Sequence, residues 1–187
     1  MSMPWYHSAF LGETFDEWYY DPFAGGLAVE DDGPLIAIHS PAEILRVLLI
    51  DMDLGFEPDL TNPVDWSVYA NAEPSKPENV ITVYDTTGVQ QARVMQGEFV
   101  EDYGIQIRFR GNDQGAIHPQ ARTVKVHLAE VLQSNRSVTV TTRVGTATYN
   151  VHALSKFGSL LNLGKDRSNS NLRLNTLNLM ATITRTE

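Results

Sequence analysis

The stretch YGIQIRFR, residues 103–110, gives the clearest indication of fold class in this sequence. Apolar side chains alternate there with glycine, glutamine and arginine, which is the period-two pattern of a strand with one buried face. The apolar set consists of Tyr103, Ile105, Ile107 and Phe109. Residues 112–115 (NDQG) then break the strand, and apolar residues at helical spacing follow. The region therefore predicts a half-buried strand that leads into an amphipathic helix.

Two helices are expected in all. Before the first, Ser40 suits the N-cap, Pro41 suits the first helical position and Glu43 completes a capping box. This helix should run to about Gly55, because glycine is common just after a helix end. The second helix should begin near Pro119. Its apolar stripe consists of Ala121, Val124, Leu128, Val131 and Leu132.

The other strands are short and rich in β-branched and aromatic residues. They are expected at 66–70, 80–84, 138–140 and 147–151, with a fainter one around 91–95. Gly145 marks the turn of a hairpin, and alternation in the last apolar segment slips by one residue between Leu174 and Leu177, which suggests a bulge or a break. The predicted fold class is α+β, a largely antiparallel sheet with two helices packed on one face.

The first 34 residues form an acidic, aromatic N-terminal arm that precedes a single domain over residues 35–187. Eight of the chain's aromatic residues lie within the first 23 positions, with no helical or strand period. Aromatic rings are enriched at interfaces, so the arm is expected to dock on its own domain or on a neighbouring subunit. The candidate docking residues are Trp5, Tyr6, Trp18, Tyr19 and Tyr20.

Charge is unevenly divided along the chain. Residues 1–105 hold 19 acidic and 3 basic residues (−16), and residues 106–187 hold 4 acidic and 11 basic residues (+7), which together give the net charge of −9. An acidic protein is a poor general binder of nucleic-acid backbones. If the two parts occupy different surfaces, copies of the chain can meet head to tail; if they interleave in the fold, the asymmetry cancels.

Motifs for catalysis, cofactors and metals are missing from the sequence. There is no cysteine, which excludes thiolate nucleophiles and cysteine-ligated zinc. Residues 158–166 differ from a phosphate-binding loop in spacing and in having Asp166 where serine or threonine is needed. Residues 51–55 lack the later ligands of a calcium loop, and no histidine pair has zinc-binding spacing. We therefore expect no catalytic residue, no cofactor and no metal.

Membrane insertion is not expected either. The longest apolar neighbourhood, residues 35–50, is interrupted by charged and polar residues and is shorter than a membrane span of about 20 residues. The first ten residues lack the basic head and apolar region of a signal peptide. The expectation is a soluble protein that is intracellular at synthesis.

The order of these elements resembles a known family. The capped helix SPAEILRVLLIDMDLG, the strand GIQIRFRG, the helix RTVKVHLAEVL and the closing strand LRLNTLNLMATI resemble, in this order, the tail terminator proteins of long-tailed bacteriophages. These are also called minor capsid or tail-completion proteins. The strongest local likeness is IQIRFRGNDQG, and the resemblance covers roughly residues 35–187 without the aromatic arm.

The resemblance implies a structural virion protein without catalytic activity. It implies a ring, hexameric in such proteins, that caps the tail tube, stops its polymerisation and joins the tail to the neck of the head. The partners would be other copies of the chain, the tail tube protein and a head–tail connector or stopper protein, with DNA only passing through the lumen. The protein would be assembled in the host cytoplasm and located in the virion neck.

Basic residues of the second part are the candidate subunit or tail-tube contacts. Arg108 and Arg110 share one face of their strand, and Lys165 and Arg167 lie in a polar loop over residues 164–171. Two other functions remain open. One is a connector or stopper on the head side of the same junction, and the other is a small hydrolase whose site residues are dispersed in the sequence.

Overall fold

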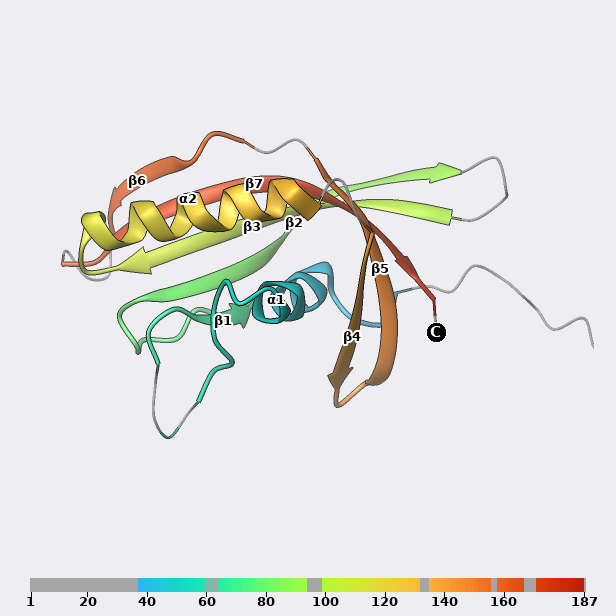
Figure 1. Cartoon of the computed structure of the whole chain (residues 1–187), viewed down its shortest axis with the longest axis horizontal. Coiled ribbons are helices and arrows are strands. Elements are labelled where there is room, and N and C mark those ends of the chain that lie inside the picture. The colour runs from blue at the N-terminus through green and yellow to red at the C-terminus, as the bar shows by residue number, and fades with distance from the viewer. Residues whose placement is uncertain are drawn as a thin grey trace, which may run out of the picture. The chain divides into compact units, whose positions relative to one another are not determined.

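Two helices and seven strands are formed by the residues that the computed structural model describes, which are 37–59, 61, 64–93, 99–131, 135–155, 158–166 and 171–186 (Figure 1). In chain order they are α1 (Pro41–Asp51), β1 (Ser67–Ala70), β2 (Val80–Arg93), β3 (Phe99–Gly111), α2 (Gln114–Val131), β4 (Arg136–Thr142), β5 (Gly145–Ser155), β6 (Leu161–Lys165) and β7 (Arg173–Arg185). The N-terminal arm and its docking residues lie outside the described residues.

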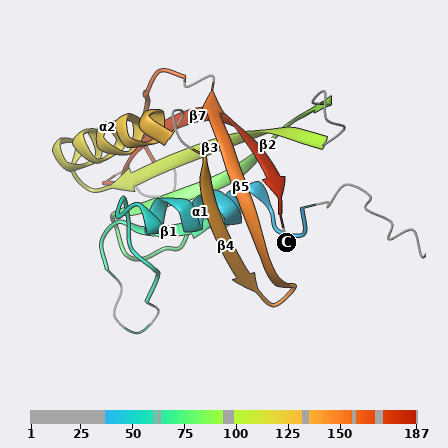
Figure 2. The same ribbon diagram turned by 45° about the vertical axis from the view of Figure 1, so that its right-hand side comes forward.

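All the described strands belong to one sheet, in the order β1-β2-β3-β7-β5-β4, with β6 also paired to β7. Every pair is antiparallel except β1 and β2. One edge of β7 pairs with β3 along its length, and its other edge carries β6 near its start and β5 near its end. Figure 2 shows β5 and β4 turning away from the other strands and running past α1. The predicted α+β class with a largely antiparallel sheet is confirmed.

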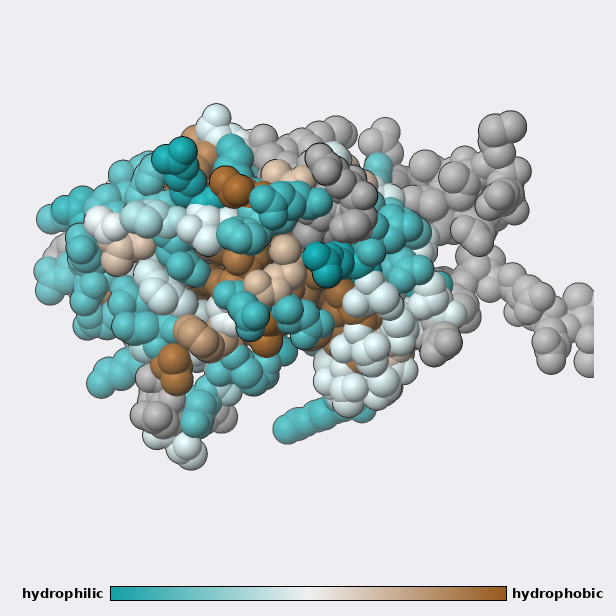
Figure 3. Space-filling model, in the orientation of Figure 1, coloured by the Kyte–Doolittle hydropathy of each residue, from teal (hydrophilic) through white to brown (hydrophobic). Residues whose placement is uncertain are grey.

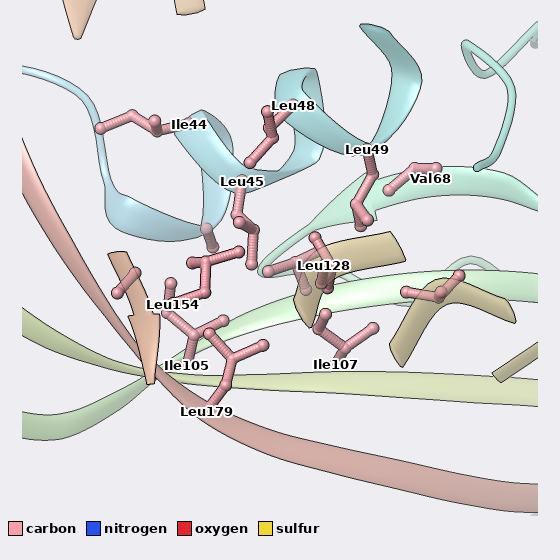
Figure 4. Close-up of a cluster of buried hydrophobic side chains, with 14 of the residues drawn as sticks. Ile44, Leu45, Leu48, Leu49, Val68, Ile105, Ile107, Leu128, Leu154 and Leu179 are labelled. Carbon is pink, nitrogen blue, oxygen red and sulfur yellow. The ribbon is translucent and has the colours of Figure 1, made fainter. Parts of the chain in front are cut away.

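Both helices pack on the same face of this sheet and share one core with it (Figure 4). The period-two pattern of residues 103–110 places Ile105, Ile107 and Phe109 on that face, fully or almost fully buried, with Tyr103 partly buried against the core. The helices contribute Ile44, Leu45, Leu48, Leu49, Ile117, Ala121, Val124 and Leu128. Burying each large aliphatic side chain contributes about 1.5–3 kcal/mol, so this face holds most of the fold's hydrophobic stabilisation.

The start of α1 is as predicted and its end is not. The Ser40 hydroxyl accepts a hydrogen bond from the Glu43 amide at 3.2 Å, and the Glu43 carboxylate accepts one from the Ser40 amide at 2.9 Å. The helix ends at Asp51, before Gly55, because Asp53 adopts a left-handed conformation with a φ of 57°. Gly55 is required for another reason: a β carbon there would clash with Val68 and lie 2.8 Å from the Trp66 carbonyl oxygen.

The second helix begins earlier than predicted, at Gln114. Asp113 initiates it, since its carboxylate accepts a hydrogen bond from the Gly115 amide at 2.9 Å and its carbonyl accepts from the next two amides. Pro119 therefore lies inside the helix. Proline is tolerated there because it is exposed, one turn in, and the carbonyl it leaves unpaired belongs to the exposed Gly115.

Three strand predictions are corrected by the pairing. Strands expected at 80–84 and 91–95 are one strand, β2, with a register shift between Thr86 and Gln90. β7 has no bulge opposite β3, because its pairing with β3 is regular. The alternation slips because Leu174, opposite Arg110, lies on the face away from the helices, whereas Leu177, opposite Ile107, lies on the helix-bearing face. The first residues of the expected polar loop belong instead to β6. This strand is almost wholly exposed, so its sequence lacks the alternation of apolar and polar residues that predicts a half-buried strand.

Candidate functional site

Glu73 is the centre of a polar cluster on the face of the sheet opposite the helices. The segment 71–79, which connects the parallel strands β1 and β2, lies against that face. Glu73 forms ion pairs with Arg108 (3.0 Å from Nη1 to Oε2) and with Arg110 (3.3 Å from Nη1 to Oε1). It also accepts a hydrogen bond from the Tyr84 hydroxyl at 3.2 Å. One carboxylate therefore joins the connecting segment to two neighbouring strands.

Burial determines the electrostatics of this cluster. Burial, followed by the neighbouring Glu73 carboxylate, raises the pKa of the Tyr84 hydroxyl, because both disfavour the phenolate. The Arg108 guanidinium lies 4.9 Å from the centre of the Tyr84 ring, within cation–π range, and acts in the opposite direction. The cluster thus keeps Tyr84 protonated as a donor to Glu73.

Arg110 is the more enclosed of the two arginines, with only 7% of its side chain exposed. Besides the Glu73 contact, it donates a hydrogen bond to the Pro77 carbonyl at 2.9 Å and a longer one to the Glu78 carbonyl at 3.5 Å. The structure therefore brings the two candidate arginines together, and both contact an acid of the same chain. Contact of these arginines with a partner remains a prediction. Arg108 is the more accessible of the two for such a contact, because its side chain is 31% exposed.

A second polar site joins the β4–β5 hairpin to the segment before α1. The Tyr149 hydroxyl accepts hydrogen bonds from the backbone amides of Ile38 and His39, both at 3.1 Å. Its own hydrogen is therefore donated to His39 Nδ1, 2.9 Å away. The other ring nitrogen then donates to the Gly145 carbonyl (3.2 Å) or the Thr142 hydroxyl (3.1 Å). Buried His39 thus fixes the position of the segment that leads into α1.

The candidate residues of the polar loop are placed only in part. Lys165 is the last residue of β6, exposed, and pairs in register with the exposed Arg173 of β7. Arg167 lies outside the described residues. Lys165 lies on the other face of the sheet from the Glu73 cluster, because it pairs with Arg173, which pairs with Gly111, whereas Arg110 pairs with Leu174. The predicted basic residues that the structure describes do not form one site.

The described histidines form no common site. His39 is buried as above, His152 contacts the Thr184 hydroxyl at 2.6 Å, and His127 contacts the Thr123 carbonyl of its own helix at 2.9 Å. In the described part of the chain, no group of three or more histidines and acids could hold a metal ion. Neither described helix has the length and apolar character needed to cross a membrane.

Sequence reasoning missed Glu73, His39 and Tyr149. One feature of the sequence could have pointed to Glu73: Arg108 and Arg110 share one strand face, and if that face is covered, the two arginines need an acidic partner. Nothing in the sequence indicated that residues 71–79 cover it. No protein-family model and no curated protein matches this chain.

Proposed function

We propose that this protein is a tail terminator of a long-tailed bacteriophage, a ring that caps the tail tube and joins it to the head. The observation that carries the proposal is the order of elements: a capped helix, a long central strand leading directly into a second helix, a hairpin, and a closing strand beside the central one. This is the order in which the sequence resembles that family.

Three features support an assembly role: the described surface, the distribution of charge along the chain, and the buried polar sites. On the face drawn in Figure 3, hydrophilic residues predominate, and hydrophobic ones are visible between the helices and in small patches beside them. Charge is also segregated along the chain, which suits head-to-tail contacts between identical copies, because such heterologous contacts close into rings. The buried polar sites at Glu73 and His39 hold the connecting segment and the hairpin in fixed positions, as a ring subunit requires.

The experiment combines the mass of the purified protein in solution with electron microscopy and a polymerisation assay. The expected result is a closed ring with a central hole that stops growth of tubes made from the tail tube protein of the same virus. A ring that binds head connectors but leaves tube length unchanged would instead identify a head-side connector or stopper. A monomer without effect on tube length would contradict both.

The aromatic arm provides a second readout of the same proposal. Deletion of residues 1–34 is expected to leave the domain folded and to weaken ring formation or tube capping, because the described residues form a hydrophobic core among themselves. A matched variant replaces Trp5, Tyr6, Trp18, Tyr19 and Tyr20 with serine while keeping the length of the arm. If the shortened chain is unfolded by circular dichroism, the arm is part of the core and the assembly role assigned to it is wrong.

A further inference from the structure

The sheet has two different outer edges along the half that contains β1, β2, β3, β7 and β6. β6 forms one edge, since among the described residues it pairs with β7 alone. At the other edge, β1 is followed by a single further rung, where Phe56 bridges Ser67 in parallel. The Phe56 amide donates to the Trp66 carbonyl at 3.1 Å, and the Phe56 carbonyl accepts from the Val68 amide at 2.9 Å. We call these the β6 edge and the Phe56 edge; Figure 1 shows them on opposite sides of the sheet.

The β6 edge is apolar and basic. Leu161 and Leu163 are 47% and 52% exposed, although an edge strand is normally protected by charged or polar side chains. Lys165 and Arg173 lie directly opposite each other, and neither forms an ion pair with any described residue. Like charges in register destabilise a strand pair, so this edge is unfavourable for an isolated subunit.

The Phe56 edge is apolar and acidic. Phe56 is 57% exposed, and the exposed Asp51, Asp53 and Glu57 lie close to it in the chain, with Glu57 paired to Arg46. Asp51 ends α1 and Asp53 follows that end, where the negative pole of the helix makes carboxylates unfavourable. This edge is therefore also unfavourable for an isolated subunit, with the opposite sign of charge.

We propose that the β6 edge of one copy docks on the Phe56 edge of the next, with Leu161 and Leu163 against Phe56, and Lys165 and Arg173 against the carboxylates. The occupant of each edge is a second copy of this chain, because the two edges complement each other in charge and match in apolar character. Neither edge suits itself, since two basic or two acidic edges repel. The contact is therefore heterologous, because two different edges meet. This inference rests on the proposed ring and names the subunit interface within it.

Engineered cysteines test the contact directly, because the chain has no cysteine of its own. The double variant Phe56→Cys with Leu163→Cys should oxidise into a ladder of disulfide-linked multimers. A disulfide within one chain is excluded, since β1, β2, β3 and β7 separate Phe56 from β6. Strand spacings of about 4.8 Å then place the two edges roughly 24 Å apart, whereas a disulfide spans at most about 7 Å between α carbons.

Two controls accompany the double-cysteine variant. Each single variant can give dimers at most, because one thiol forms one disulfide. The control pair Val144→Cys with Leu163→Cys uses the exposed hairpin turn in place of the Phe56 edge. This pair should give no ladder, so a ladder from it would mean that oxidation follows random collisions rather than a specific contact.

Charge reversal gives an independent test. Lys165→Glu with Arg173→Glu makes both edges acidic, and Asp51→Lys with Asp53→Lys makes the Phe56 edge basic like the β6 edge. Neither variant should assemble alone. An equimolar mixture should assemble with the two variants in alternation, because each acidic edge then faces a basic one. Assembly of either variant alone to the wild-type mass would overturn the proposed contact.

The results of these experiments distinguish a failure of the proposed contact from a failure of the proposed ring. A wild-type ring in which the double-cysteine variant gives no ladder overturns the contact and leaves the ring standing. A wild-type monomer overturns both. If the thiol introduced by Leu163→Cys reacts with a thiol reagent only after residues 1–34 are deleted, the chain's own arm occupies the β6 edge and the proposal is wrong.

Discussion

Glu73→Gln should lower the free energy of unfolding more than any other isosteric change on the face of the sheet opposite the helices. It removes the charge that Arg108 and Arg110 share and leaves the Arg110 guanidinium with two backbone carbonyls as partners. Breaking a buried ion pair from one side destabilises by about 3–5 kcal/mol. Because Arg108 is about one third exposed and can turn to solvent, we expect the lower end, about 3 kcal/mol.

The assay is urea unfolding followed by circular dichroism, with thermal unfolding as a check. For a domain of this size, about 3 kcal/mol lowers the Tm by roughly 6–12 °C. The matched control is Glu57→Gln, which removes an ion pair to Arg46 in which the Glu57 side chain is 67% exposed, and which should change stability by less than about 1 kcal/mol. Equal effects of the two variants would refute the assignment of Glu73 as the buried centre of the cluster.

Tyr84 reports on the same cluster by its ionisation. Its pKa is raised above the usual 10.0 in the folded protein, so its contribution to stability is complete below about pH 10 and is lost as the pH rises through the folded pKa. Alkaline difference absorbance should therefore show a late tyrosine ionisation that is lost in Tyr84→Phe. In Glu73→Gln this pKa should fall, because the neighbouring negative charge is gone. An unchanged pKa would show that burial alone sets it.

Three other substitutions test the local structure, each by the free energy of unfolding in urea. Ser40→Ala should lower stability by about 1 kcal/mol, because it removes the cap of α1; no change would mean that the cap is replaced by solvent. Tyr149→Phe leaves the Ile38 and His39 amides without their shared acceptor and should lower it by about 2–3 kcal/mol; Tyr69→Phe is the control. Gly55→Ala should lower it by about 1–3 kcal/mol through the clash with Val68, and a neutral result would show that the loop moves freely.

Elements whose signal is local could be predicted from the order of residues. The capping box at Ser40 and Glu43 is formed by residues three apart, and the alternation of Ile105, Ile107 and Phe109 is set by the two-residue repeat of a strand. Both follow from chain geometry over a few residues, so they were readable without knowledge of the fold. The end of α1 and the start of α2 were misplaced, because a left-handed Asp53 and an Asp113 cap compete with the usual glycine and proline signals.

Which distant residues meet depended instead on the fold as a whole. The sequence pattern indicates that Arg108 and Arg110 are candidate contact residues, whereas in the fold the 71–79 segment covers them and Glu73 pairs with both. β6 carries exposed leucines, so its place at a sheet edge depends on pairing with β7 rather than on its own pattern. In both cases the deciding energy comes from burial and pairing between segments far apart in the chain. Periodicity along the sequence reports only which way each side chain points, and not what lies opposite it.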